Sequence, residues 1–153
     1  MIVQLNRGAE ENVTRIPAPA ADPVVAVFGQ QSRVGALPQY LPSGWSTRRL
    51  DELGEARPGE MIVLSGAKVE DVRLARAILP RDSRVVALID DWAPAELVAG
   101  VLTAGADVCV RGGHPAILAG HLVACRRRQL TERWASFELA QRDLTDRGLA
   151  QTA

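Results

Sequence analysis

Four short apolar runs constrain the fold of this 153-residue chain more than any other feature of its sequence. They are VVAVF from Val24, MIVL from Met61, VVALI from Val85 and DVCV from Asp107. Continuous β-branched and aliphatic runs of this length, without polar alternation, are typical of strands that are covered on both faces. The four runs therefore predict buried strands of a parallel sheet.

The segments between these runs have the length and pattern of helices. Residues 69–79 carry apolar side chains at roughly helical spacing and end at Pro80. Residues 94–104 begin with a proline and end at Gly105. Strands that alternate with helices predict an α/β fold of the flavodoxin-like (βα)5 type, a three-layer sandwich around a five-stranded parallel sheet.

The region between the first two strong runs is less regular. Residues 32–41 favour a short helix, which Pro38 and Pro42 would make irregular. Residues 45–50 favour a weaker edge strand, which would be the fifth strand of the sheet.

The chain is long enough for one domain with tails. Residues 1–22 mix charges with the passage Ile-Pro-Ala-Pro-Ala-Ala, a composition that favours a flexible, solvated tail. Residues 23–128 are predicted to form the domain and residues 129–153 an extended C-terminal helical segment. Nothing breaks the helical pattern from His114 to Gly148, which predicts one long helix or a pair of helices.

The second half of this helical region has an a/d-type seam, with alternating spacings of four and three residues. Its members are Val123, Arg127, Leu130, Trp134, Phe137, Gln141 and Leu144. These residues could pack back on their own domain. We instead predict a homodimer through Leu130, Trp134, Phe137 and Leu144, because large exposed aromatic side chains usually mark a contact.

The charge is balanced, with 18 basic and 18 acidic residues, so no overall field recruits nucleic acid or anionic lipid. The run from Arg126 to Arg128, with Arg133, could contact nucleic-acid phosphates, but a charged run on a long helix is usually a solvated face. The N-terminal residues offer neither a signal peptide nor a membrane helix. We expect a cytoplasmic protein with no membrane partner.

The two cysteines and two histidines lack the spacing of a metal site, so no metal is expected. Cys109 and Cys125 are predicted to be buried small hydrophobic residues. No nucleophile–base pair and no cofactor loop is evident, which predicts no cofactor and no enzymatic activity.

The stretch RVVALIDDWAPAELVAGVLTAGADVCVRGGHPAILAGHLVACRRR, residues 84–128, resembles the second half of a response-regulator receiver domain. The resemblance lies in a strand, a helix that ends in Ala-Gly-Ala-Asp, a strand that follows at once, and a final helix that ends in arginines. It implies a CheY-like fold and a role in two-component signal transduction.

The resemblance also implies five functional positions, and this chain departs from the family pattern at each. The acidic pair that binds Mg²⁺ corresponds to Gly29 and Gln30, and the phospho-accepting aspartate corresponds to Ser65. The switching Thr or Ser corresponds to Ile89, and the lysine corresponds to Gly112. Because phosphoryl transfer relies on positioned charge and metal, their joint loss implies a degenerate pseudo-receiver.

Three charged residues could form a displaced site at the same edge of the sheet: Asp90, Asp91 and Arg111. The alternative is that Asp90 and Asp91 are loop and helix-capping acids before Pro94. His114 is predicted to be a helix-start residue rather than a base or ligand.

The nearest subgroup by resemblance is the N-terminal half of antitermination regulators that carry an RNA-binding ANTAR domain. Those proteins share a degenerate pocket, a sheet followed by a long coiled-coil helix, and a passage similar to Leu144-Thr-Asp-Arg. The resemblance implies a regulatory module that is controlled by a protein partner or ligand in transcription or antitermination. A variant RNA-binding antiterminator and an atypical phospho-accepting receiver are the alternatives.

Overall fold

The computed structural model describes residues 21–150 of the chain, so most of the predicted N-terminal tail and residues 151–153 lie outside the described part. Of the described residues, 21–133 form one compact unit, and 134–150 belong to a second unit. The predicted boundaries at residues 22 and 128 stay predictions.

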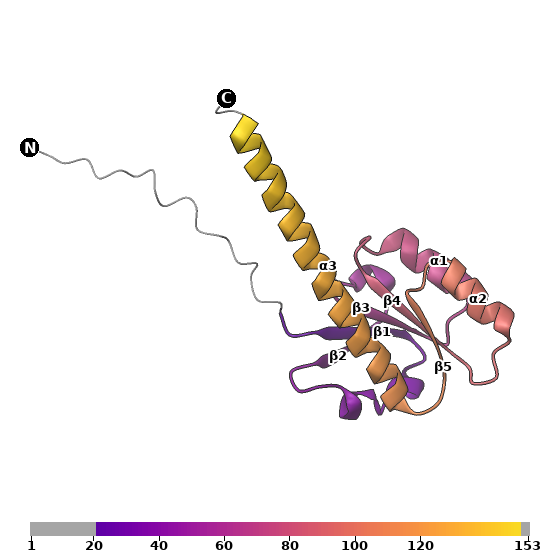
Figure 1. Ribbon diagram of the computed structural model, residues 1–153. Coiled ribbons are helices and arrows are strands. Elements are labelled where there is room, and N and C mark those ends of the chain that lie inside the picture. The colour runs from indigo at the N-terminus through magenta and orange to yellow at the C-terminus, as the bar shows by residue number, and fades with distance from the viewer. Residues whose placement is uncertain (1–20, 151–153) are drawn as a thin grey trace, which may run out of the picture. The chain divides into compact units, whose positions relative to one another are not determined.

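The first unit is built on one five-stranded parallel sheet with the strand order β2-β1-β3-β4-β5 (Figure 1). The strands are β1 (Val24–Gly29), β2 (Ser46–Leu50), β3 (Met61–Ser65), β4 (Arg84–Ile89) and β5 (Val108–Arg111). This is the order of flavodoxin-like folds. The predicted α/β class, the five strands and the edge position of residues 45–50 are therefore confirmed, but the run from Asp107 forms a second edge strand in which only Val110 is buried.

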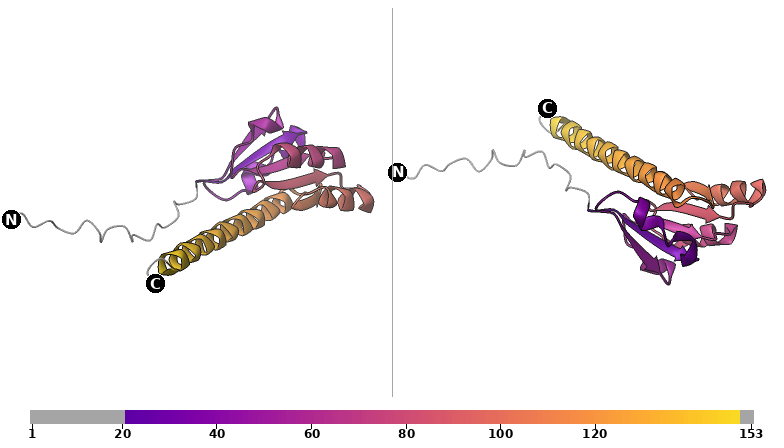
Figure 2. Two further views of the ribbon diagram at one scale, coloured as in Figure 1. Left: turned by 90° about the horizontal axis from the view of Figure 1, so that it is seen from above. Right: turned by 90° about the horizontal axis from the view of Figure 1, so that it is seen from below.

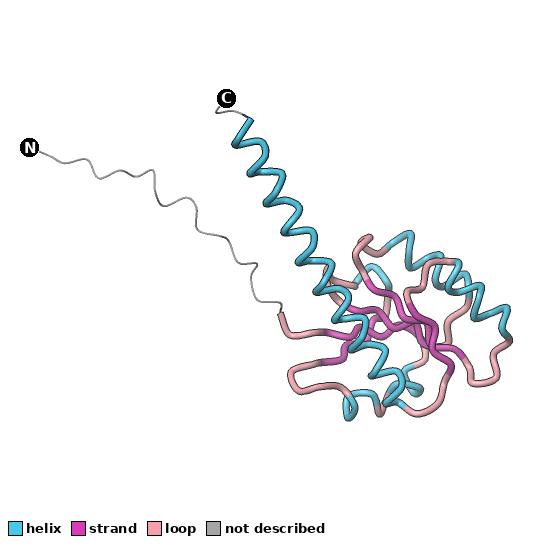
Figure 3. Tube along the Cα trace, viewed as in Figure 1, coloured by secondary structure: helices cyan, strands magenta, loops and turns pink. Residues whose placement is uncertain are grey.

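The helical connections are less uniform than the sequence suggests. The α-helices are α1 (Val69–Ile78), α2 (Ala95–Thr103) and α3 (Pro115–Ala150), and the 3₁₀ helices are η1 (Gln31–Val34), η2 (Leu37–Tyr40) and η3 (Leu53–Glu55) (Figure 3). The expected irregular helix at 32–41 is the pair η1 and η2. Pro38 removes a backbone N–H from this connection, which disfavours a continuous α-helix.

Helices cover both faces of the sheet, as Figure 2 shows, and an apolar core lies on each face. The helices α1 and α2 cover one face, where Ile62 and Leu64 of β3 are buried. The first part of α3 covers the other face together with η1 and η2, where Met61 and Val63 are buried. Successive side chains of a strand point to opposite faces, so β3 is buried on both sides, as its unbroken apolar run predicts.

The C-terminal helical region is one continuous helix rather than a pair. Its buried stripe comprises Leu118, Ala119, Leu122, Cys125, Arg126 and Gln129. This spacing is that of an amphipathic helix lying on a sheet. Within residues 21–150, no helix combines the length and apolar character that a membrane span requires.

Candidate functional site

All the candidate residues of the sheet lie at its carboxyl edge, where parallel strands of open α/β folds end together and bind ligands. Gly29, Ser65 and Ile89 are the last residues of β1, β3 and β4. Arg111 ends β5 and Gly112 follows it. Gln30 follows β1, and Asp90 and Asp91 follow β4. The structure thus brings together the residues that the sequence selects.

The edge between β1 and β3 is closed by backbone contact. Gly29 pairs with Ser65 in the parallel register and has a φ of +103°. A Cβ atom added to Gly29 would lie 2.3 Å from the backbone oxygen of Ser65. No carboxylate can therefore occupy position 29 unless one of the two strands moves.

Ser65 is engaged in the same contact. Ser65 is only 5% exposed, and its hydroxyl donates a hydrogen bond to the carbonyl oxygen of Gln30 at 2.7 Å. The Gln30 N–H donates in return to the Ser65 carbonyl oxygen at 3.2 Å. No basic side chain of the described residues hydrogen-bonds to this hydroxyl, although a serine nucleophile needs a base for its activation.

The side chain of Gln30 covers the turn after β3. A Cβ atom added to Gly66 would lie 2.8 Å from Cδ of Gln30, which shows how closely the amide lies over this glycine. We call Gly29, Gln30, Ser65 and Gly66 the closed edge. The closed edge occupies the position where the resemblance places a phosphorylation site.

Arg33 of η1 links the closed edge to the residue that follows β4, a role that its sequence context does not predict. Its guanidinium donates to the side-chain oxygen of Gln30 and to the carboxylate of Asp90, which lies 57 positions along the chain. Asp90 and Asp91 lie in the loop after β4, as the alternative expected, but α2 begins without a side-chain N-cap bond, so the capping role expected of them is wrong. The carboxylate of Asp90 instead has a cationic partner.

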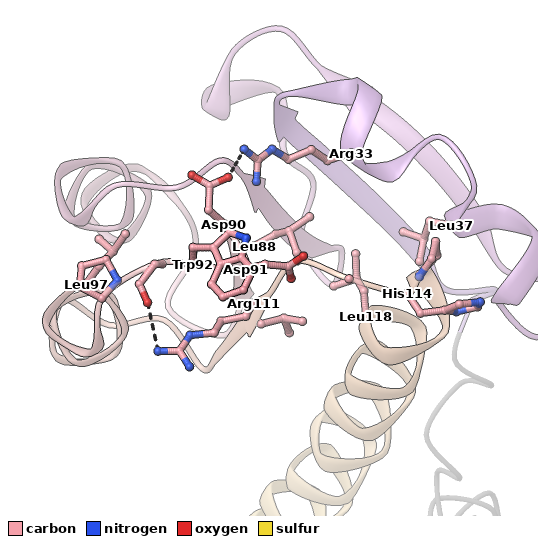
Figure 4. Close-up of a pocket in the computed structure, with 16 residues that line it drawn as sticks. Arg33, Leu37, Leu88, Asp90, Asp91, Trp92, Leu97, Arg111, His114 and Leu118 are labelled. Atoms are coloured by element: carbon pink, nitrogen blue, oxygen red, sulfur yellow. Dashed lines mark hydrogen bonds and ion pairs between the residues drawn. The ribbon is translucent and has the colours of Figure 1, made fainter.

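A cavity of about 590 Å³ lies beside the closed edge, over β4 and β5 and the starts of α2 and α3 (Figure 4). Its apolar lining includes Leu88, Val110 and Leu118, and its polar lining includes Asp91 and His114. None of the four closed-edge residues lines it. We call this space the β4–β5 cavity. The β4–β5 cavity is therefore displaced from Ser65.

The rim of the β4–β5 cavity carries an exposed aromatic ring and two charged groups. Trp92 is 95% exposed. Arg111 donates from Nη2 to the carbonyl oxygen of Ala93 at 3.1 Å, and Figure 4 shows its side chain directed toward the start of α2. The carboxylate of Asp91 lies beside Gly112, where an added Cβ would be 3.2 Å from Oδ1. A lysine at position 112 would require the Asp91 carboxylate to shift by a few tenths of an ångström.

His114 acts as a helix-start residue, as predicted. Its Nδ1 accepts a hydrogen bond from the N–H of Ala116 at 3.1 Å, in the first turn of α3. Its ring packs edge-to-face against Tyr40, with the ring centroids 4.9 Å apart. These contacts anchor η2 to the start of α3.

The cysteines and the possible metal ligands are the remaining reactive side chains of residues 21–150. Between residues 21 and 150, no three His, Cys, Asp or Glu side chains gather into a group that could hold a metal ion. Cys125 is buried and Cys109 is half-buried, so the predicted burial is confirmed for Cys125 and only partly for Cys109. Burial raises the pKa of the Cys109 thiol, although Arg111 opposes the shift, so the protonated form is favoured.

The comparisons with known proteins bear on the fold. No family model and no curated protein matches the sequence. A solved structure described as the signal receiver domain of an HD domain-containing protein from Pseudomonas fluorescens Pf-5 matches with a TM-score of 0.61 and 12% sequence identity. The match covers 78% of this chain and 97% of that chain. The chain therefore has the fold of a receiver domain, and the predicted CheY-like fold is confirmed.

Proposed function

We propose that this chain is a non-enzymatic signalling module, a pseudo-receiver that works without phosphorylation. The fold of a signal receiver domain supports the signalling role. The observation that carries the proposal is the closed edge, in which Gly29 leaves no space for a side chain and Ser65 is buried and hydrogen-bonded. A pocket in this state has neither the metal ligands nor the nucleophile that phosphoryl transfer needs.

Control by a ligand or a protein partner takes the place of phosphorylation in this proposal. The β4–β5 cavity, of about 590 Å³, falls in the size range of small-molecule sites and combines apolar walls with a few polar groups. The exposed ring of Trp92 at its rim is the kind of side chain that anchors a protein contact. A signal received here would act next to the Arg33–Asp90 ion pair, which links η1 to β4.

We further propose that the chain dimerises through α3 and acts in transcriptional or antitermination regulation, like the pseudo-receiver half of ANTAR-type regulators. The support is the 4-3 spacing of Leu130, Trp134, Phe137 and Leu144 on one continuous helix. Trp134 and Leu144 are 51% and 70% exposed, so their apolar surface is available to a second copy. The exposed guanidinium groups of Arg127 and Arg128 leave a variant RNA-binding antiterminator as the second candidate.

Magnesium titration tests the proposal at the closed edge. Followed by the backbone amide resonances of Gln30, Ser65 and Asp91, the full chain should show no saturable shift at millimolar Mg²⁺, because positions 29 and 30 supply no carboxylate. A saturable shift centred on Asp90 and Asp91 would instead indicate an atypical phospho-accepting receiver with its metal ligands displaced.

A further inference from the structure

One residue breaks the apolar character of the buried stripe on α3. Arg126 occupies a stripe position between Leu122 and Gln129 and is only 9% exposed. The expectation that the run Arg126–Arg128 forms a solvated face is therefore wrong for its first member. Arginine is almost never fully buried unless it is paired, so this burial requires a partner.

The partners of Arg126 within the described residues are neutral. Its Nη1 donates to Oε1 of Gln129 at 3.0 Å, and its Nη2 donates to the carbonyl oxygen of Ala21, also at 3.0 Å. No carboxylate among residues 21–150 forms an ion pair with it. Burial lowers the pKa of Arg126, and the charge of Arg133 lowers it further. Among residues 21–150, the guanidinium is thus a buried cation beside a second cation, with no carboxylate at ion-pair distance.

A cavity of about 250 Å³ opens beside this guanidinium at the amino edge of the sheet, opposite to the closed edge. Three arginines line it: Arg57, Arg126 and Arg133. We call this space the arginine cavity. Its two acidic side chains are Asp22 and Glu60.

The negative charge of Glu60 is already balanced by an ion pair with Arg48. Its carboxylate accepts hydrogen bonds from Arg48 Nη2 at 2.7 Å and from Arg48 Nε at 3.0 Å. Burial raises the pKa of Glu60, but the hydrogen bonds from Arg48 and from the Arg57 N–H outweigh it, so the net pKa lies below its ordinary value. Glu60 therefore stays ionised and paired with Arg48, which is outside the lining. The lining of the arginine cavity keeps an excess of positive charge.

We propose that the arginine cavity binds a phosphate group, either as inorganic phosphate or as the monoester of a small molecule. Guanidinium groups present planar pairs of N–H donors that match phosphate oxygens in a bidentate manner. Two of the five N–H groups of Arg126 are used by Gln129 and Ala21, which leaves donors for an anion. This site is separate from the closed edge and does not rest on the proposed function.

Calorimetric titration of the full chain with inorganic phosphate, in low-salt buffer at neutral pH, tests the site. Saturable one-to-one binding is expected, and Arg126→Gln should weaken it by about tenfold or more because a charge-assisted contact is lost. Arg133→Gln should weaken it as well, and this exposed residue can be replaced without disturbing the core. A second titration uses glycerol 3-phosphate. If this monoester binds more tightly than inorganic phosphate, the ligand of the cavity is a phosphate monoester.

Arg128→Gln is the matched control, since Arg128 lies on the same helix, is exposed and does not line the arginine cavity. Its affinity for phosphate should equal that of the unmodified chain. Sodium chloride at the same ionic strength should not compete. The proposal is overturned if the unmodified chain shows no saturable binding, or if Arg133→Gln and Arg128→Gln weaken it equally.

Discussion

Replacing Gly29 with alanine should destabilise the chain by about 3 kcal/mol, because the added methyl group meets two penalties at once. The residue has a φ of +103°, a conformation that side chains other than glycine rarely adopt. The new Cβ would also lie 2.3 Å from the backbone oxygen of Ser65. Relief of this contact requires β1 and β3 to separate at their carboxyl ends.

Urea unfolding of the two proteins measures this loss of free energy. Gly54→Ala is the matched control, because Gly54 has no positive φ and no atom within 4 Å of its added Cβ. The control should stay within about 0.5 kcal/mol of the unmodified chain. A Gly29→Ala variant as stable as the control would show that the edge is open enough to accept a side chain, and the account of a closed edge would fail.

Replacing both Trp134 and Phe137 with alanine should convert the proposed dimer to a monomer. The two rings lie on one face of α3, with centroids 6.2 Å apart in an edge-to-face arrangement. Aromatic anchors at an interface each contribute about 2 kcal/mol or more. Losing both should therefore raise the dissociation constant by about a thousandfold.

Sedimentation velocity over a concentration series measures this change on full-length proteins. Leu139→Ala is the control, because Leu139 is 63% exposed but does not follow the 4-3 spacing of the seam. It should leave the mass of the dimer unchanged. If the unmodified chain sediments as a monomer at every concentration, the proposed dimer is wrong and the seam residues have another role.

The strands could be predicted from the sequence because each depends on a local run. The run from Met61 predicts a strand buried on both faces from its local sequence alone, and the structure places this strand in the centre of the sheet. The edge strand is harder to predict because Thr47 and Arg49 are exposed and carry no apolar signal. Pro38 and Pro42 correctly predicted that the connection between β1 and β2 would not be a regular α-helix.

The closed edge and the arginine cavity could not be predicted because both depend on contacts between distant residues. The bond from Ser65 to Gln30 spans 35 positions, and that from Arg126 to Ala21 spans 105. A signal for Arg126 was present, since it falls on the same helical stripe as Leu118, Leu122 and Cys125. The run Arg126–Arg128 instead favoured the prediction of a solvated face, because runs of charged residues on a helix are usually solvated.

With its edge closed between β1 and β3, this receiver fold should not accept a phosphoryl group. Incubation of the full chain with acetyl phosphate and Mg²⁺, followed by intact mass spectrometry, measures this directly. The mass should stay unchanged, because Ser65 is buried, its hydroxyl donates to Gln30, and no basic side chain of residues 21–150 hydrogen-bonds to it. A mass increase of one phosphoryl group that disappears in Ser65→Ala, or in Asp90→Asn with Asp91→Asn, would contradict it.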